Sequence, residues 1–272
     1  MNNCIFYKHN EIAHYNEEEI IETTSTRIDG KPTLDSFFNK DDKAILKDEN
    51  NYYVYENSWV EHFNKNGYSV YSLDLQGHGQ SDGWKNLSLN INEFDDLVYD
   101  VVQYIRKINE NLLRLSDDIS SVATCEDNIG CKKLLPMYII GQSMGGNIAL
   151  RTLELLGKSK DNDNKINIKG CISLSSMISF HKIEPPAVNN LDNDMAHIPK
   201  DIPILLIHSK DDIFCHYKGT VSFYDRLDNE NKELHTIENM EHGLTVEPGN
   251  EKILEKVIEW LSNLSTKELM DA

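Results

Sequence analysis

"MYIIGQSMGGNIAL", residues 137–150, places a serine between glycines at the junction of two apolar runs. The run before the serine is typical of a buried strand, and the run after it is typical of a helix. Glycine at positions 141 and 145 leaves room for the strand and the helix to fold back on each other, because neither residue carries a side chain. The stretch therefore predicts a sharp strand-to-helix turn that holds Ser143 at the carboxyl end of a strand, where open α/β sheets bind ligands.

Segments typical of strands and helices alternate around this turn. We expect strands at 68–75, 134–140, 168–176, 202–209 and 232–238, and helices at 58–67, 91–115, 146–157, 217–227 and 251–264. This alternation predicts an α/β fold with a mostly parallel sheet and helices on both of its faces. We interpret residues 1–272 as a single domain, with a weakly structured part at 1–50 and a polar inserted loop at 116–133.

Composition and charge argue against several partners and locations. The net charge is −18 and Lys and Arg are scattered, so we expect no nucleic-acid partner. There is no bilayer-length apolar run and no secretory pattern at the start of the sequence, which predicts a cytoplasmic protein. The five cysteines have no metal-ligand spacing and fit a reducing compartment better than a disulfide framework, although Cys125 and Cys131 could pair across a loop.

A serine hydroxyl becomes a nucleophile when a base lies within hydrogen-bond reach and a carboxylate orients that base. Asp211 and Asp212 follow one expected strand, and His242 follows the next. Because the carboxyl ends of parallel strands meet at one edge, we expect these side chains to lie on the same rim as Ser143. The chain order Ser, Asp, His is that of the α/β-hydrolase fold.

Each of these residues also has a simpler interpretation. Ser143 could be a small residue in a surface turn, and His242 a histidine in a solvated loop. Only one of the adjacent aspartates can face His242, so the other is expected to cap a backbone group or to be solvated. The remaining histidines considered lack a comparable placement and are interpreted as structural or solvated; they are His62, His208, His216 and His235.

Four motifs in this order resemble the monoacylglycerol lipase and lysophospholipase group of α/β-hydrolases, and most closely its apicomplexan parasite members. They are "DLQGHGQSDG" (74–83), "GQSMGGNIAL" (141–150), "SKDDIFCHYKG" (209–219) and "MEHG" (240–243). The resemblance covers most of the chain from about Tyr52 onward. It implies hydrolysis of a carboxylic ester in a monoacyl lipid, with no metal and no cofactor.

The resemblance also assigns roles to individual residues. The lysine and glycine of "CHYKG" align the family's acid with Asp212, the second of the two aspartates. Ser143 corresponds to the nucleophile and His242 to the base. The backbone N–H of Met144 corresponds to one donor of the oxyanion hole, and we interpret His78 as structural.

The sequence departs from the family in two places. Before the strand at 68–75 the family has a buried strand ending in His-Gly, which lies beside the nucleophile's strand and whose loop supplies the second oxyanion donor. The best candidate here, "KAILK" (43–47), is too short, so we expect a missing central strand and unpaired backbone groups beside it. The family's helical lid is reduced to about two dozen polar residues at 177–202.

These observations favour a serine ester hydrolase that forms an acyl-enzyme on a small-molecule lipid ester. The intact Ser, Asp and His support this hypothesis. The missing strand and lid support a second one, in which the chain is a shortened, catalytically impaired remnant that binds a lipid or a protein. An aminopeptidase on the same fold is a third hypothesis, ranked lower because no acidic cluster is placed to hold a substrate amine. Oligomeric state and peripheral membrane contact stay open.

Overall fold

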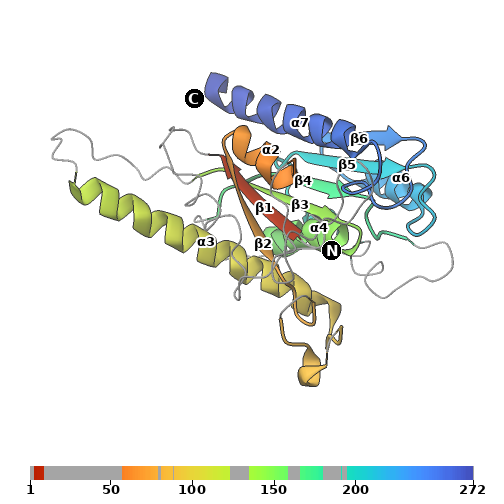
Figure 1. Cartoon of the computed structure of the whole chain (residues 1–272), viewed down its shortest axis with the longest axis horizontal. Helices are drawn as coiled ribbons and strands as arrows, with labels where there is room; N and C mark the ends of the chain where they lie inside the picture. Colours follow the sequence, from red (N-terminus) through yellow and green to blue (C-terminus); the bar gives the residue numbers. More distant parts are fainter. Residues whose placement is uncertain are drawn as a thin grey trace.

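The computed structural model describes residues 3–8, 57–78, 81–87, 89–122, 135–158, 166–179, 191 and 195–271. They form a six-stranded sheet in the order β2-β1-β3-β4-β5-β6, with helices on both faces (Figure 1). The predicted α/β fold is confirmed. No helix in the described ranges is both long enough and apolar enough to span a bilayer.

The strands are β1 (Asn3–Lys8), β2 (Tyr68–Leu73), β3 (Met137–Gln142), β4 (Ile168–Leu174), β5 (Ile204–Ser209) and β6 (Lys232–Ile237). The helices are α2 (Trp59–Lys65), α3 (Phe94–Val122), α4 (Met144–Lys158), α6 (Tyr217–Arg226) and α7 (Asn250–Asp271), with 3-10 turns η2 (Trp84–Asn86) and η3 (Met195–His197). Every strand and helix expected from the sequence is present, and the ends agree within a few residues except at the carboxyl ends of α3 and α7, which extend further than expected.

Helix α3 is longer than its apolar pattern predicted. Residues 116–122 were expected to begin a polar loop, but they continue the helix to Val122. Extending a helix fixes one further residue for each added hydrogen bond, so a polar stretch can prolong a helix that is already formed. The expected loop is therefore wrong over 116–122, and the rest of it, like Cys125 and Cys131, lies outside the described residues.

Strands β3 to β6 run parallel and end together. Gln142 is opposite Leu174, Leu174 is opposite Ile207, and Ser209 is opposite Ile237. The loops that follow β3, β5 and β6 therefore leave the sheet at one rim. A shared rim is what the sequence predicted for the side chains of these three loops.

The position expected to be empty in the centre of the sheet is occupied by β1, which lies between β2 and β3 (red in Figure 1). It runs antiparallel to both neighbours, with Ile5 opposite Tyr71 on one side and Ile139 on the other. The expectations of a gap beside β3 and of a weakly structured start were therefore wrong for 3–8. Residues 9–56, including "KAILK", lie outside the described residues.

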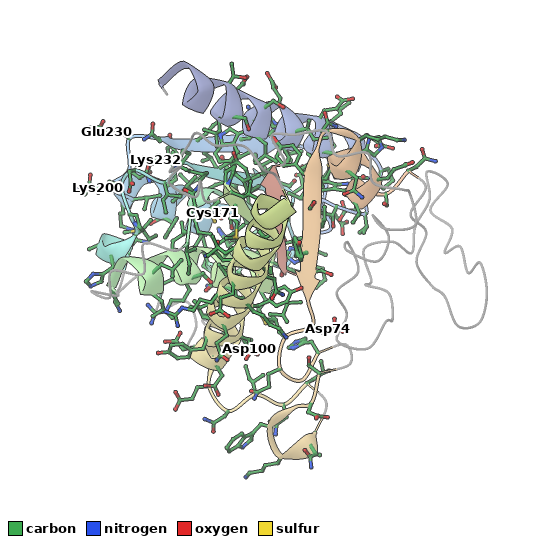
Figure 2. All side chains as sticks on the ribbon, turned by 90° about the vertical axis from the view of Figure 1, so that its left-hand side faces the viewer. Asp74, Asp100, Cys171, Lys200, Glu230 and Lys232 are labelled. Carbon is green, nitrogen blue, oxygen red and sulfur yellow. The ribbon has the colours of Figure 1, made fainter. Side chains whose placement is uncertain are left out.

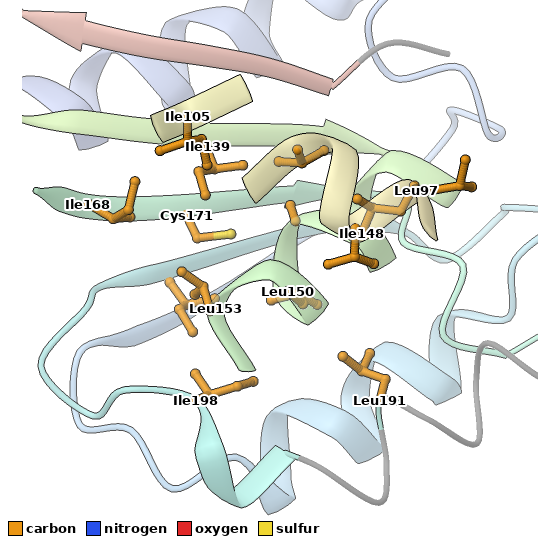
Figure 3. Close-up of a cluster of buried hydrophobic side chains, with 14 of the residues drawn as sticks. Leu97, Ile105, Ile139, Ile148, Leu150, Leu153, Ile168, Cys171, Leu191 and Ile198 are labelled. Carbon is orange, nitrogen blue, oxygen red and sulfur yellow. The ribbon is translucent and has the colours of Figure 1, made fainter. Parts of the chain in front are cut away.

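The sheet separates two apolar layers because successive strand residues point to opposite faces. In β5, Leu206 packs with α3, α4 and α6, whereas Leu205 and Ile207 pack with α2 and α7. Figure 3 shows the first layer, where Cys171 lies among aliphatic side chains. Burial raises the pKa of the Cys171 thiol to about 12, so it packs as a small apolar group.

Helix α4, which begins directly after Ser143, is fixed to α3 by buried charges. The guanidinium of Arg151 donates to both carboxylate oxygens of Asp95 in α3, at 3.1 and 2.8 Å. Its third nitrogen donates to Glu154 at 2.8 Å. The bidentate pair with Asp95 thus joins the middle of α4 to the long helix, and Glu154, one turn further along α4, orients the guanidinium.

Candidate active site

The turn between β3 and α4 has the geometry that its glycines predicted. Ser143 has a positive φ of 56°, an uncommon conformation for a residue with a side chain. A Cβ at Gly141 would lie 2.0 Å from the carbonyl oxygen of Gly145. A Cβ at Gly146 would lie 2.6 Å from the hydroxyl of Ser176. These contacts leave no room for side chains where the helix doubles back on the strand.

Ser143, His242 and Asp212 form a continuous hydrogen-bonded chain. Nε2 of His242 lies 2.8 Å from Oγ of Ser143, and Nδ1 lies 2.8 Å from Oδ2 of Asp212. Because a carboxylate only accepts, Nδ1 carries the hydrogen and Nε2 is left to accept from the serine hydroxyl. The imidazole is thereby held in the tautomer that can take the serine proton.

Asp212 is buried and receives hydrogen bonds on both oxygens. The backbone N–H groups of Phe214 and Cys215 each donate to Oδ1 at 2.8 Å. Nδ1 of His242 and Nε2 of His208 lie 2.8 and 3.2 Å from Oδ2. Burial alone would raise the pKa of Asp212, but the donors from His208, His242 and Cys215 together hold it well below its usual range.

The loop carrying His242 is anchored by side chains on either side. The amide of Gln142 donates to the backbone carbonyl of His242 at 3.1 Å and accepts from the hydroxyl of Thr245 at 2.6 Å. The carboxylate of Glu247 accepts from the backbone N–H groups of Glu241, at 2.6 Å, and of Gly243. The residues flanking the imidazole are therefore fixed by hydrogen bonds.

Other residues singled out in the sequence lie away from this chain of contacts. Asp211 accepts from the backbone N–H of Asn239 at 2.7 Å, a cap that joins the loops after β5 and β6. Nδ1 of His78 lies 2.9 Å from the carbonyl of Gln76. The backbone N–H of Gln76 donates to Asp100 on α3 at 3.1 Å, in the region labelled by Asp74 and Asp100 in Figure 2.

Three contributors to the site were not identified as site residues from the sequence: His208, Gln142 and Glu247. His208 was interpreted as structural or solvated, and it proves to be fully buried and in contact with Asp212. Gln142 lies far from His242 along the chain, so no local spacing could indicate its contact. Glu247 accepts from N–H groups only a few residues before it in the same loop, a local contact that its residue type alone does not reveal. A histidine at the end of an apolar strand, four residues before a candidate acid, is the one hint that was present.

Cys215 lies against the same chain of residues. Burial, followed by the charge of Asp212, raises the pKa of its thiol to about 12, although a hydrogen bond with Ser143 acts in the other direction. Among the described residues, Asp212, Cys215 and His242 form the only group of three or more possible metal ligands whose ligand atoms all lie within 4.8 Å of one another. Since the thiol stays protonated and Nδ1 of His242 donates to Asp212, the set fits a hydrogen-bonded relay better than a metal ion.

Apolar side chains adjoin the site on the solvent side. The centroids of the Phe214 and His242 rings are 5.4 Å apart. Phe214 and its neighbour in the sequence, Ile213, are both exposed. Helix α4 starts at Met144, so the N–H of that residue belongs to the first turn, which has no intrahelical acceptor and carries the positive end of the helix dipole. The rim thus offers an apolar contact and a backbone donor beside Ser143.

Comparison with known proteins agrees with the observed fold. A family model described as Serine aminopeptidase, S33 (Hydrolase_4) matches residues 50–199 and 186–249. A search of the curated proteins gives no significant match to this sequence.

Several solved structures are similar in fold. The monoacylglycerol lipase of Paleococcus ferrophilus matches with a TM-score of 0.53 and 14% identity, over 77% of this chain and 89% of that one. A soluble variant of Saccharomyces cerevisiae monoglyceride lipase, in complex with a substrate analogue, matches with a TM-score of 0.55 and 16% identity, over 75% and 80%. The likeness shows the α/β-hydrolase fold, and the closeness to apicomplexan members stays a prediction.

Proposed function

The chain belongs to the Serine aminopeptidase, S33 family of α/β-hydrolases, and we propose that it is a serine hydrolase cleaving the carboxylic esters of monoacyl lipids. The proposed type is a lysophospholipase or monoacylglycerol lipase. Family and fold support a hydrolase of the esterase or lipase kind. The choice of substrate and the serine mechanism are the parts that we propose.

The observation that carries the proposal is the hydrogen-bonded chain from Ser143 through His242 to Asp212. In the proposed reaction, Oγ of Ser143 attacks the ester carbonyl while Nε2 of His242 takes its proton, and the acyl group passes to the serine. His242 then returns the proton to the departing alcohol. A water molecule, deprotonated in the same way, releases the fatty acid.

Charge on the reacting centre would be stabilised from two directions. Asp212, ionised and held by its donors, stabilises the imidazolium that forms on His242. The N–H of Met144, at the amino end of α4, is the proposed donor to the oxyanion. The exposed rings and chains of Phe214 and Ile213 beside His242 support an apolar acyl group as the bound part of the substrate.

An aminopeptidase is the second candidate, because the matching family model carries that description. Both reactions would use the same three side chains, so only substrates can separate them. A lipid-binding remnant without turnover is the third, motivated by the absence of a parallel strand in the place held by β1.

Fluorophosphonate labelling of the purified chain, with Ser143→Ala as the control, tests the proposal. We expect labelling that requires Ser143, together with hydrolysis of a monoacylglycerol or of lysophosphatidylcholine. Labelling with turnover of an aminoacyl anilide alone would favour the aminopeptidase. A folded chain that neither labels nor turns over any ester would overturn the proposed function and support the remnant.

A further inference from the structure

His208 is a buried titratable residue that the proposed mechanism does not use. It lies in β5 with no exposed surface, and Asp212 follows four residues later. Nε2 of His208 lies 3.2 Å from Oδ2 of Asp212 and 3.2 Å from the carbonyl oxygen of Cys215. Nδ1 lies 2.7 Å from the hydroxyl of Thr220 in α6.

These contacts define which ring nitrogen of His208 carries the hydrogen. The carbonyl of Cys215 and the carboxylate of Asp212 can only accept, so Nε2 must carry a hydrogen to avoid two repulsive contacts. The hydroxyl of Thr220, fully buried like the ring, can then donate to Nδ1. Thr220 thereby selects the tautomer with its N–H aimed at Asp212, and this assignment follows from the hydrogen-bond network.

Oδ2 of Asp212 is the oxygen that also accepts from Nδ1 of His242. A second donor on that oxygen limits rotation of the carboxylate about its bond to Cβ, while the backbone N–H groups of Phe214 and Cys215 hold the other oxygen. With both oxygens fixed, the one facing His242 keeps its direction. Side chains behind a reacting group commonly affect activity through this kind of orientation.

We propose that His208 is a positioning residue for Asp212, and that Thr220 in turn fixes the tautomer of His208. This inference rests on the proposed function, since orienting Asp212 matters only if Asp212 orients a catalytic His242. It assigns to a buried histidine and a buried threonine an indirect part in the reaction, for which the only hint in the sequence was the place of His208 four residues before Asp212.

The first test compares two substitutions of His208. His208→Gln keeps a side-chain N–H near the position of Nε2, whereas His208→Met fills similar volume without a donor. We expect about a tenfold fall in kcat for the Met variant with KM unchanged, and about a threefold fall or less for the Gln variant. Equal losses in two folded variants would overturn the proposal, because a packing role does not distinguish a donor from a thioether.

A variant at Thr220 tests the same inference even if the substitutions at His208 prevent folding. Thr220→Val keeps the shape of the side chain but removes the hydroxyl that selects the tautomer of His208. We expect it to lower kcat in the same direction as His208→Met and by a smaller factor. Turnover equal to that of the natural chain would contradict the role given to Thr220.

Nitrogen NMR of the imidazoles gives a readout that does not depend on turnover. In the natural chain we expect His208 to carry its hydrogen on Nε2, and a hydrogen on Nδ1 alone would overturn the inference even if the enzyme is active. A natural chain with the expected tautomer but neither labelling nor turnover would overturn the proposed function and, with it, the catalytic part of this inference. An active natural chain with equal losses in both His208 variants would overturn the inference alone.

Discussion

In the carboxyl-terminal part of the sheet β3 to β6 run parallel, whereas in the amino-terminal part β1 runs antiparallel to both of its neighbours. Each parallel strand delivers its following loop to the same rim, and the three side chains of the candidate site come from three such loops. The antiparallel strand β1 has its end, Lys8, at the opposite rim. The two parts therefore contribute differently: one supplies the side chains of the candidate site and the other supplies hydrogen bonds to the sheet.

This difference bears on the oxyanion hole. In the resembling family the second donor comes from a loop that follows a parallel strand, and β1 occupies the place of that strand while running the other way. Losing one such donor typically lowers the rate by about a hundred- to a thousandfold. Among the described residues, the comparison thus predicts an assembled nucleophile, base and acid with the N–H of Met144 as the one proposed oxyanion donor.

The largest expected effect tests whether the carboxyl-terminal part carries the chemistry. Asp212→Asn replaces an acceptor of the His242 N–H by an amide and should lower kcat by about 10⁴-fold, because the imidazole then adopts the wrong tautomer. Asp211→Asn is the matched control and should stay within about threefold, since Asp211 contacts only a backbone N–H in the described structure. Steady-state hydrolysis of a monoacyl ester measures both, and a reversal of the two losses would reassign the acid.

The next effect tests the structural role of the amino-terminal part. Ile5→Pro removes a backbone N–H from a strand paired on both sides and should lower the free energy of unfolding by about 3 kcal/mol. Ile5→Thr keeps the N–H and is the control. Urea unfolding measures both, and equal midpoints for Ile5→Pro and the natural chain would show that β1 does not hold the centre of the sheet.

A smaller effect tests how the His242 loop is held. Glu247→Gln removes the charge and one of the two acceptors for the N–H groups of Glu241 and Gly243, and we expect about a tenfold fall in kcat/KM. Glu251→Gln, an exposed position in the first turn of α7, serves as the control. If both variants keep full activity, the loop is held by Gln142 without Glu247.

The smallest expected effect is on the pH dependence of the free energy of unfolding. Since the pKa of Asp212 is lowered on folding, its stabilisation is fully present above its ordinary pKa of 3.8 and is lost as the pH falls through the lower folded value. The stability difference between the natural chain and Asp212→Asn should therefore stay constant from about pH 7 to pH 5 and narrow only below 3.8. Thermal unfolding across this range measures it, and a difference that disappears by pH 5 would mean that the donors do not hold the carboxylate ionised.

Much of the fold could be predicted because its signals are local. Apolar runs mark β3 and β5, and the three- and four-residue spacing of Phe94, Leu97 and Val101 marks α3. The turn at Ser143 follows from its glycines. Strand β1 could not be predicted in the same way, because "NCIFYK" is short and its partners, β2 and β3, lie far along the chain.

The same distinction between local signals and contacts made only on folding applies to the candidate site. The order of Ser143, Asp212 and His242 along the chain, with each after a strand, predicted that they would share a rim, and their roles stay proposals. Gln142 reaches the His242 loop from a distant part of the chain, and the shorter-range contacts of His208 and Glu247 depend on loop conformations that only the folded chain defines. Hydrogen bonds of this kind leave no period or spacing in a sequence.

Strand β1 also has a consequence for the order of folding. It is synthesised before both of its partners, and its backbone groups on one side are satisfied by β3, which begins only at Met137. Contacts between such distant segments slow folding, because a long loop must close before they form. During synthesis the backbone groups on this side of β1 therefore stay unpaired with β3 until β3 has left the ribosome. A chain released earlier lacks the strand that forms these hydrogen bonds in the folded sheet.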